Sequence, residues 1–62
     1  MCLSTVYQEV KGERSKLCEY VSNVTSSEGS IVMTDIMGRE ISVRGTLKSM
    51  DLIKNEIIIA GD

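Results

Sequence analysis

Residues 30–45 read SIVMTDIMGREISVRG. The first six are rich in β-branched and apolar side chains, which is typical of a strand. The next four contain Gly38, which can adopt the positive φ that a tight turn needs. In the five residues that follow, apolar Ile41 and Val43 alternate with polar neighbours, which is typical of a second strand with one buried face. The segment therefore predicts two strands joined by a turn, and Gly45 permits a sharp bend or bulge directly after them.

Similar short strands are expected on both sides of this pair. They fall at residues 3–10, 16–20, 21–25 and 57–59, and turn-forming residues separate them at 11–14, 26–29 and 54–56. The run of three isoleucines at 57–59 is typical of a strand that is covered on both faces. Short strands with turns about every eight to ten residues predict an all-β domain that closes into a barrel.

One segment supports two interpretations. Leu47, Met50 and Ile53 recur at helical spacing, which allows one short helical turn near residues 47–53, but an irregular strand fits the same side chains. With either, the whole chain, residues 1–62, is expected to form a single SH3-like, Sm-like or OB-like barrel of about five to seven short strands.

Composition limits the chemistry. A chain of 62 residues buries only about 60% of its unfolded surface, so a metal, a disulfide or self-association usually supports it. The sequence has no His, Trp, Phe or Pro, and its only aromatic residues are Tyr7 and Tyr20. Without His there is no Ser-His or Cys-His pair, no imidazole ligand and no ordinary base near neutral pH. We therefore expect a protein that is not an enzyme.

Charge argues against two further classes of protein. The formal net charge is −2, and the seven basic residues are interleaved with nine acidic ones. A nucleic-acid-binding protein usually has a basic excess or stripe. No apolar run approaches the ~18 residues of a membrane span, and no signal-peptide pattern is present. The expected location is the cytoplasm, where thiols stay reduced.

Several side chains that could bind metal have simpler interpretations. Cys18 lies in an apolar-leaning strand and is expected to be a small buried residue, although metal ligation or a disulfide with Cys2 would also use it. Met33, Met37 and Met50 lack a paired spacing and are expected to pack in the core. The acidic residues without calcium-loop spacing, which are expected on the solvated surface, are Asp35, Glu40 and Asp51.

Cys2 is the strongest candidate ligand. Removal of Met1, which a small second side chain permits, would leave Cys2 with a free α-amino group next to its thiol. The two groups together can chelate one metal ion in a five-membered ring. Nitrogen and sulfur donors of this kind suit a square-planar ion such as Ni(II). Two such ends, or one end with its backbone amides, would supply four donors.

Several segments together resemble a known family. They are Met1-Cys2-Leu3 followed by Thr5-Val6-Tyr7, then Thr34-Asp35-Ile36-Met37-Gly38, then Gly45-Thr46-Leu47-Lys48-Ser49-Met50-Asp51-Leu52, and last Ile57-Ile58-Ile59. In this order and spacing, they resemble the small nickel-binding CooT proteins, accessory factors for carbon monoxide dehydrogenase. The chain also resembles short proteins once described as RNA-binding.

The resemblance implies a nickel(II)-binding metallochaperone that assists nickel insertion into carbon monoxide dehydrogenase or a related nickel enzyme. It implies Cys2 as the metal ligand, and a homodimer in which each protomer contributes Cys2 to one nickel ion. The expected partners are carbon monoxide dehydrogenase or its maturation proteins. The alternative is a small RNA-binding barrel, which the negative charge and the scarcity of aromatic residues disfavour. An interaction module that pairs a strand edge with a partner protein is a third possibility.

Overall fold

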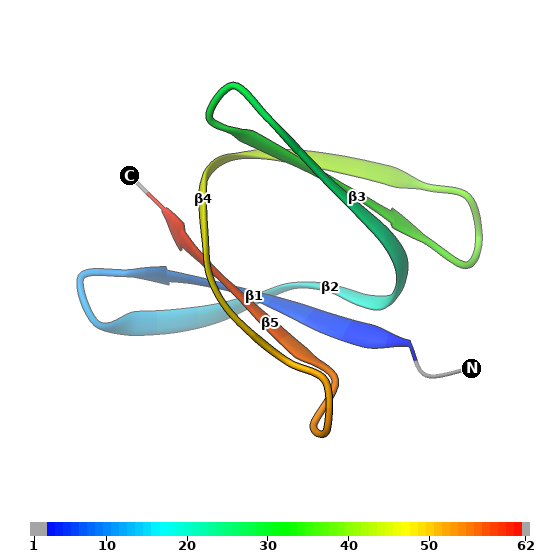
Figure 1. Ribbon diagram of the computed structural model, residues 1–62, viewed down its shortest axis with the longest axis horizontal. Helices are drawn as coiled ribbons and strands as arrows, with labels where there is room; N and C mark the ends of the chain where they lie inside the picture. The colour runs from blue at the N-terminus through cyan, green and yellow to red at the C-terminus, as the bar shows by residue number, and fades with distance from the viewer. Residues whose placement is uncertain (1–2, 62) are drawn as a thin grey trace.

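The computed structural model describes residues 3–61 and shows a closed β-barrel (Figure 1). Its strands are β1 (Ser4–Val10), β2 (Glu13–Ser27), β3 (Ser30–Asp35), β4 (Glu40–Asp51) and β5 (Glu56–Gly61). Neighbours in the chain pair antiparallel, and a parallel pairing of β1 with β5 closes the barrel. The predicted small all-β barrel is confirmed.

Two long strands replace shorter predicted elements: β2 covers the strands predicted at 16–20 and 21–25, and β4 joins the strand predicted at 40–44 to most of the ambiguous segment 47–53. The first half of β2 pairs with β1 and its second half pairs with β3, whereas β4 pairs first with β3 and then with β5. In β2 the change of partner coincides with a positive φ of 58° at Tyr20 and a register shift between Val21 and Asn23. In β4 it occurs at Gly45, where φ is 152°. The chain bends at these points but stays in the sheet. Residues that were expected to separate two strands are therefore bends within one strand.

Gly45 is the one bend that requires a glycine for space. A Cβ atom there would lie 2.5 Å from the carbonyl oxygen of Ala60 and 3.0 Å from Cγ2 of Ile59. Because β4 crosses so close to β5, only a residue without a side chain fits at this point.

Of the two interpretations of residues 47–53, the irregular strand is confirmed as far as Asp51, and the helical turn is absent. Strand β4 continues to Asp51 with a register shift between Leu47 and Ser49, and a turn follows at residues 52–55. The bulge explains the misleading periodicity, because an extra residue in a strand interrupts the alternation of its two faces. Residues 3–61 form no helix, and therefore none that could cross a membrane.

The core is aliphatic and contains one thiol. Its members are Val6, Cys18, Val21, Ile31, Met33, Ile57 and Ile59. Ile57 and Ile59 face inward, while Ile58 between them is half-buried on the outer face. The predicted core position is confirmed for Met33 but wrong for Met37, which is 76% exposed in the β3–β4 turn, and for Met50, which is 48% exposed.

Candidate functional site

The barrel end where β1 begins is the part of the structure next to Cys2. Cys2 itself lies outside the described residues, so its ligand role stays a prediction. Ser4 pairs with Val21 of β2, and the backbone N–H of Thr5 donates to the carbonyl oxygen of Asn55 over 2.9 Å. Cys2 precedes Ser4 by two residues in the sequence, so this end of the barrel is the part of the described structure that adjoins it in the chain.

Two turns flank the start of β1 (Figure 1). The β3–β4 turn is held against β2, because the backbone N–H of Ile36 donates to the carbonyl oxygen of Tyr20 over 3.1 Å. The β4–β5 turn ends at Asn55, which accepts from the start of β1. These backbone contacts bring both turns close to the start of β1.

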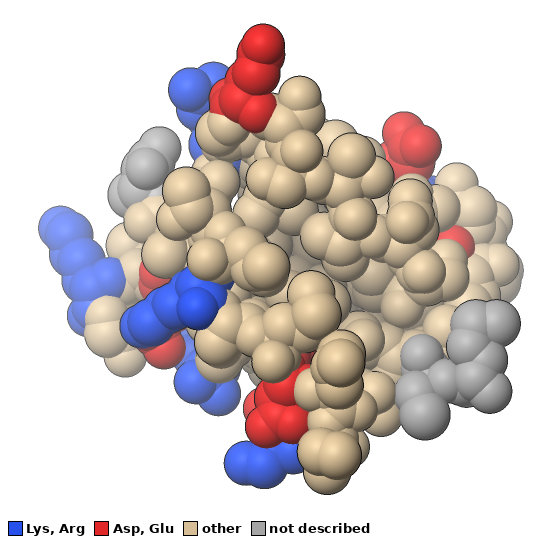
Figure 2. All heavy atoms as spheres, viewed as in Figure 1, with Lys and Arg blue, Asp and Glu red and all other residues tan. Residues whose placement is uncertain are grey.

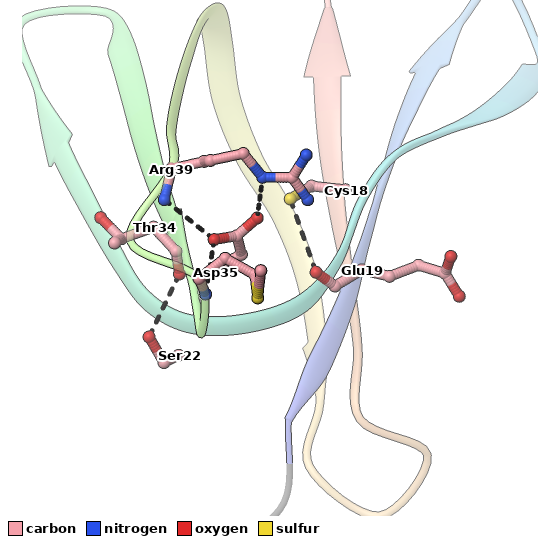
Figure 3. Close-up of polar contacts among 7 residues, drawn as sticks. Cys18, Glu19, Ser22, Thr34, Asp35 and Arg39 are labelled. Atoms are coloured by element: carbon pink, nitrogen blue, oxygen red, sulfur yellow. Dashed lines mark hydrogen bonds and ion pairs between the residues drawn. The ribbon is translucent and has the colours of Figure 1, made fainter.

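A buried carboxylate fixes the β3–β4 turn (Figure 3). Oδ1 of Asp35 accepts the backbone N–H groups of Arg39 and Met37, each over 2.9 Å, and Oδ2 accepts Nε of Arg39, also over 2.9 Å. The backbone N–H of Arg39 is the largest cause of a lowered pKa at Asp35, and the side chains of the two residues form an ion pair that acts in the same direction. The prediction of a solvated Asp35 is wrong: the residue is buried, because its carboxylate replaces water with hydrogen bonds inside the turn.

A second aspartate fixes the β4–β5 turn. Oδ1 of Asp51 accepts the backbone N–H groups of Ile53 and Lys54, each over 3.0 Å. These bonds, led by that from Lys54, lower the pKa of Asp51. Side-chain carboxylates therefore fix the backbone of both turns, and the apolar side chains on these turns are exposed.

Five large apolar side chains are exposed at this end of the barrel, and we call them the apolar end. They are Tyr20 (60% exposed), Ile36 (58%), Met37 (76%), Leu52 (74%) and Ile53 (92%). The sequence patterns did not predict this set, because four of its members lie in turns. In a turn, periodicity does not indicate whether a side chain is buried or exposed. The signal that could have revealed it is the presence of apolar pairs, Ile36-Met37 and Leu52-Ile53, in turn segments.

Cys18 lies in the barrel wall and is only 9% exposed. It faces Val6 across the β1–β2 pairing, and its thiol makes one weak hydrogen bond, to the carbonyl oxygen of Glu19 over 3.6 Å. The prediction that Cys18 is a small buried residue is confirmed. Within residues 3–61, no three side chains of His, Cys, Asp or Glu lie close enough together to hold a metal ion.

The opposite side of the barrel is charged. Glu9 forms ion pairs with Lys48 and Arg14, the latter over 3.7 Å, and the guanidinium of Arg14 lies 5.7 Å from the ring centre of Tyr7. Lys48 is the largest cause of a lowered pKa at Glu9. Figure 2 shows most of the visible Lys and Arg side chains toward the side of the β1–β2 hairpin. Acidic side chains lie among these basic ones, just as acidic and basic residues are interleaved in the sequence.

Comparison with known proteins identifies one family. The family model described as "CO dehydrogenase accessory protein CooT" matches residues 1–60. The crystal structure of a protein assigned as CooT from Carboxydothermus hydrogenoformans has the same fold, with a TM-score of 0.88, 15% sequence identity and coverage of 98% of each chain. No curated protein matches the chain.

Proposed function

Because the chain belongs to the CooT family of CO dehydrogenase accessory proteins, we propose that it carries Ni(II) for insertion into carbon monoxide dehydrogenase or a related nickel enzyme. The observation that carries the proposal is the family match over residues 1–60, which includes Cys2. In this role the protein is not an enzyme. It works in the cytoplasm and meets the client or its maturation proteins there.

Cys2 is the proposed ligand. Once Met1 is removed, the α-amino nitrogen and the thiolate of Cys2 form one chelating pair. The ordinary pKa of an α-amino group is about 7.7–8.0 and that of a thiol is about 8.5, so both lose protons to a metal near neutral pH. Two chains would supply two nitrogens and two sulfurs, a set that suits Ni(II).

The described residues support Cys2 over Cys18 as the ligand. Cys18 is buried in the core beside aliphatic side chains and has no second donor of the kind that Cys2 has in its own amine. The sequence contains no histidine that could compete for nickel. The start of β1 is anchored on two sides, so the tether to Cys2 begins from a fixed point.

Nickel titration of protein with a verified N-terminus tests the proposal. Intact mass spectrometry first establishes that Met1 is absent, and equilibrium dialysis then measures bound nickel per chain, with the thiolate-to-nickel absorption band as a second signal. We expect one nickel per one or two chains. The Cys2→Ser variant should lose tight binding and the band, while Cys18→Ser, checked for folding by circular dichroism, should keep both. Unchanged nickel affinity in Cys2→Ser would contradict the proposal.

The client is tested separately, in cells that make a nickel-containing carbon monoxide dehydrogenase. At limiting nickel, replacing the wild-type chain by Cys2→Ser should lower the nickel content of the purified enzyme, and added nickel should restore it. Equal nickel content at limiting nickel would show that the chain does not supply this client. A salt-sensitive affinity for single-stranded RNA, with no nickel binding, would support the RNA-binding alternative instead.

A further inference from the structure

The first half of β2 has one edge without a partner strand. Strand β1 pairs with one edge of β2 from Glu13 to Val21, whereas β3 pairs with the other edge only from Val21 onward. Every second residue of an antiparallel strand directs both its backbone N–H and its C=O away from the paired neighbour. Residues 13–18 therefore present backbone donors and acceptors to a position that no strand of residues 3–61 occupies. We call this stretch the free edge.

A groove of about 780 Å³ lies along the free edge. Its lining consists of five consecutive residues of β2, 16–20, together with Asp35 and residues 39–41. Successive side chains of a strand point to opposite faces, so a groove that touches five residues in a row meets the strand along its edge. Figure 3 shows Cys18 of β2 and Arg39 of the β3–β4 turn, which both line this groove.

The chain itself occupies the continuation of this edge. The backbone N–H of Ile36, in the β3–β4 turn, donates to the carbonyl oxygen of Tyr20 over 3.1 Å, and β3 pairs with β2 from Val21 onward. Tyr20 has a φ of 58°, which is rare for a bulky residue, and the bend at this residue separates the occupied part of the edge from the empty part. An extended segment beside residues 13–18 would therefore extend a sheet that β3 already extends farther along.

The side chains of the groove provide a shallow apolar surface. Leu17 and Ile41 are partly buried and pack against the core, and Cys18 is only 9% exposed. An added strand directs alternate side chains to one face. One set of its side chains can therefore contact these apolar groups while the other set stays in solvent.

The charges of the groove indicate which partner fits. Lys16 pairs with Glu19 over 3.4 Å, and Arg39 pairs with Asp35 over 2.9 Å, so these four charges compensate each other. Glu40 also lines the groove, and no ion pair of Glu40 exists among the residues that the structure describes. The groove therefore has one acidic group left for a basic side chain of a partner.

We propose that the free edge binds an extended segment of a partner protein, which adds to the sheet as a further strand. The segment has alternating apolar and polar side chains, with a Lys or Arg beside Glu40. Backbone hydrogen bonds supply affinity in this kind of recognition, and side-chain contacts supply selectivity. The inference goes beyond the proposed function, since it involves neither nickel nor Cys2.

Selection from a phage-displayed library of random peptides on the immobilised, metal-free chain tests the inference. We expect the enriched peptides to alternate apolar with polar residues and to contain Lys or Arg. A synthetic copy of the most enriched peptide, at saturation, should slow hydrogen exchange about tenfold or more at alternate backbone amides of residues 13–18, as measured by NMR. Exchange in residues 23–27, which β3 already pairs, should stay unchanged.

Charge reversal at Glu40 tests the selectivity. Glu40→Lys should weaken binding of this peptide about threefold to tenfold, because an attraction between exposed charges becomes a repulsion of similar size. A peptide with Glu in place of its Lys or Arg should bind Glu40→Lys better than it binds the wild type. Glu28→Lys is the matched control, because Glu28 is also exposed but lies in the β2–β3 turn, outside the lining of the groove. It should bind the original peptide as the wild type does.

Three results would overturn the inference: no enrichment above an unrelated protein, binding that leaves exchange in residues 13–18 unchanged, or equal losses in Glu40→Lys and Glu28→Lys. Slow exchange at these amides that appears without peptide and grows with protein concentration would also overturn it, because a second copy would then occupy the edge. None of these measurements involves nickel, so the inference and the proposed function can fail separately.

Discussion

Replacing Gly45, at the bend within β4, by alanine should destabilise the barrel more than the same change at the turn glycines Gly12, Gly29 or Gly38. Gly45 has a φ of 152°, and an added Cβ would meet the Ala60 carbonyl oxygen at 2.5 Å. A side chain at such a φ costs about 1–3 kcal/mol of backbone strain. Moving β4 away from β5 to relieve the clash costs about 1–3 kcal/mol more. The expected loss is therefore about 2–6 kcal/mol, from a total unfolding free energy of about 3–9 kcal/mol for a domain of this size.

Gly12 provides the matched control. It also has a positive φ, 81°, but nothing lies within 4 Å of an added Cβ. The Gly12→Ala variant should therefore lose only the cost of a left-handed residue, about 1–2 kcal/mol. Urea unfolding followed by circular dichroism, at one protein concentration for all variants, measures both losses. If Gly45→Ala loses no more free energy than Gly12→Ala, the argument that β4 must cross β5 without a side chain is refuted.

Three further predictions concern the core, a buried charge and the metal. Ile59→Ala, at a fully buried position, should lose about 2–5 kcal/mol in the same urea assay; a loss under ~1 kcal/mol would contradict the described core. The lowered pKa of Asp35 means that its contribution to stability is present above about pH 4 and is lost as pH falls through the folded-state value. The plot of urea midpoint against pH should therefore fall less steeply below about pH 4 in Asp35→Asn, and parallel curves would count against the role of the carboxylate. Nickel affinity, measured by dialysis, should fall steeply from about pH 8 to 6, because protons compete for the amine and thiolate of Cys2; a flat profile would exclude that donor pair.

Local sequence patterns predicted the barrel because its strands obey simple rules. Gly38 takes the positive φ that its turn suggested, 87°, and the Ile57–Ile59 run forms a strand between two neighbours. The five strands lie within the predicted five to seven, but the boundaries of the strands were harder to predict. A bend at Tyr20 or Gly45 interrupts the pattern of side chains as a loop does, and only the backbone pairing across the bend shows that the strand continues.

Positions that depend on tertiary contacts were predicted less well. Asp35 has a sequence context typical of a surface residue, yet a turn that folds back over its carboxylate buries it. Met37 is an apolar residue that the same turn holds in solvent. In both cases the turn geometry, which sequence periodicity does not encode, decides burial. The exposed apolar residues of the two turns were not predicted for the same reason.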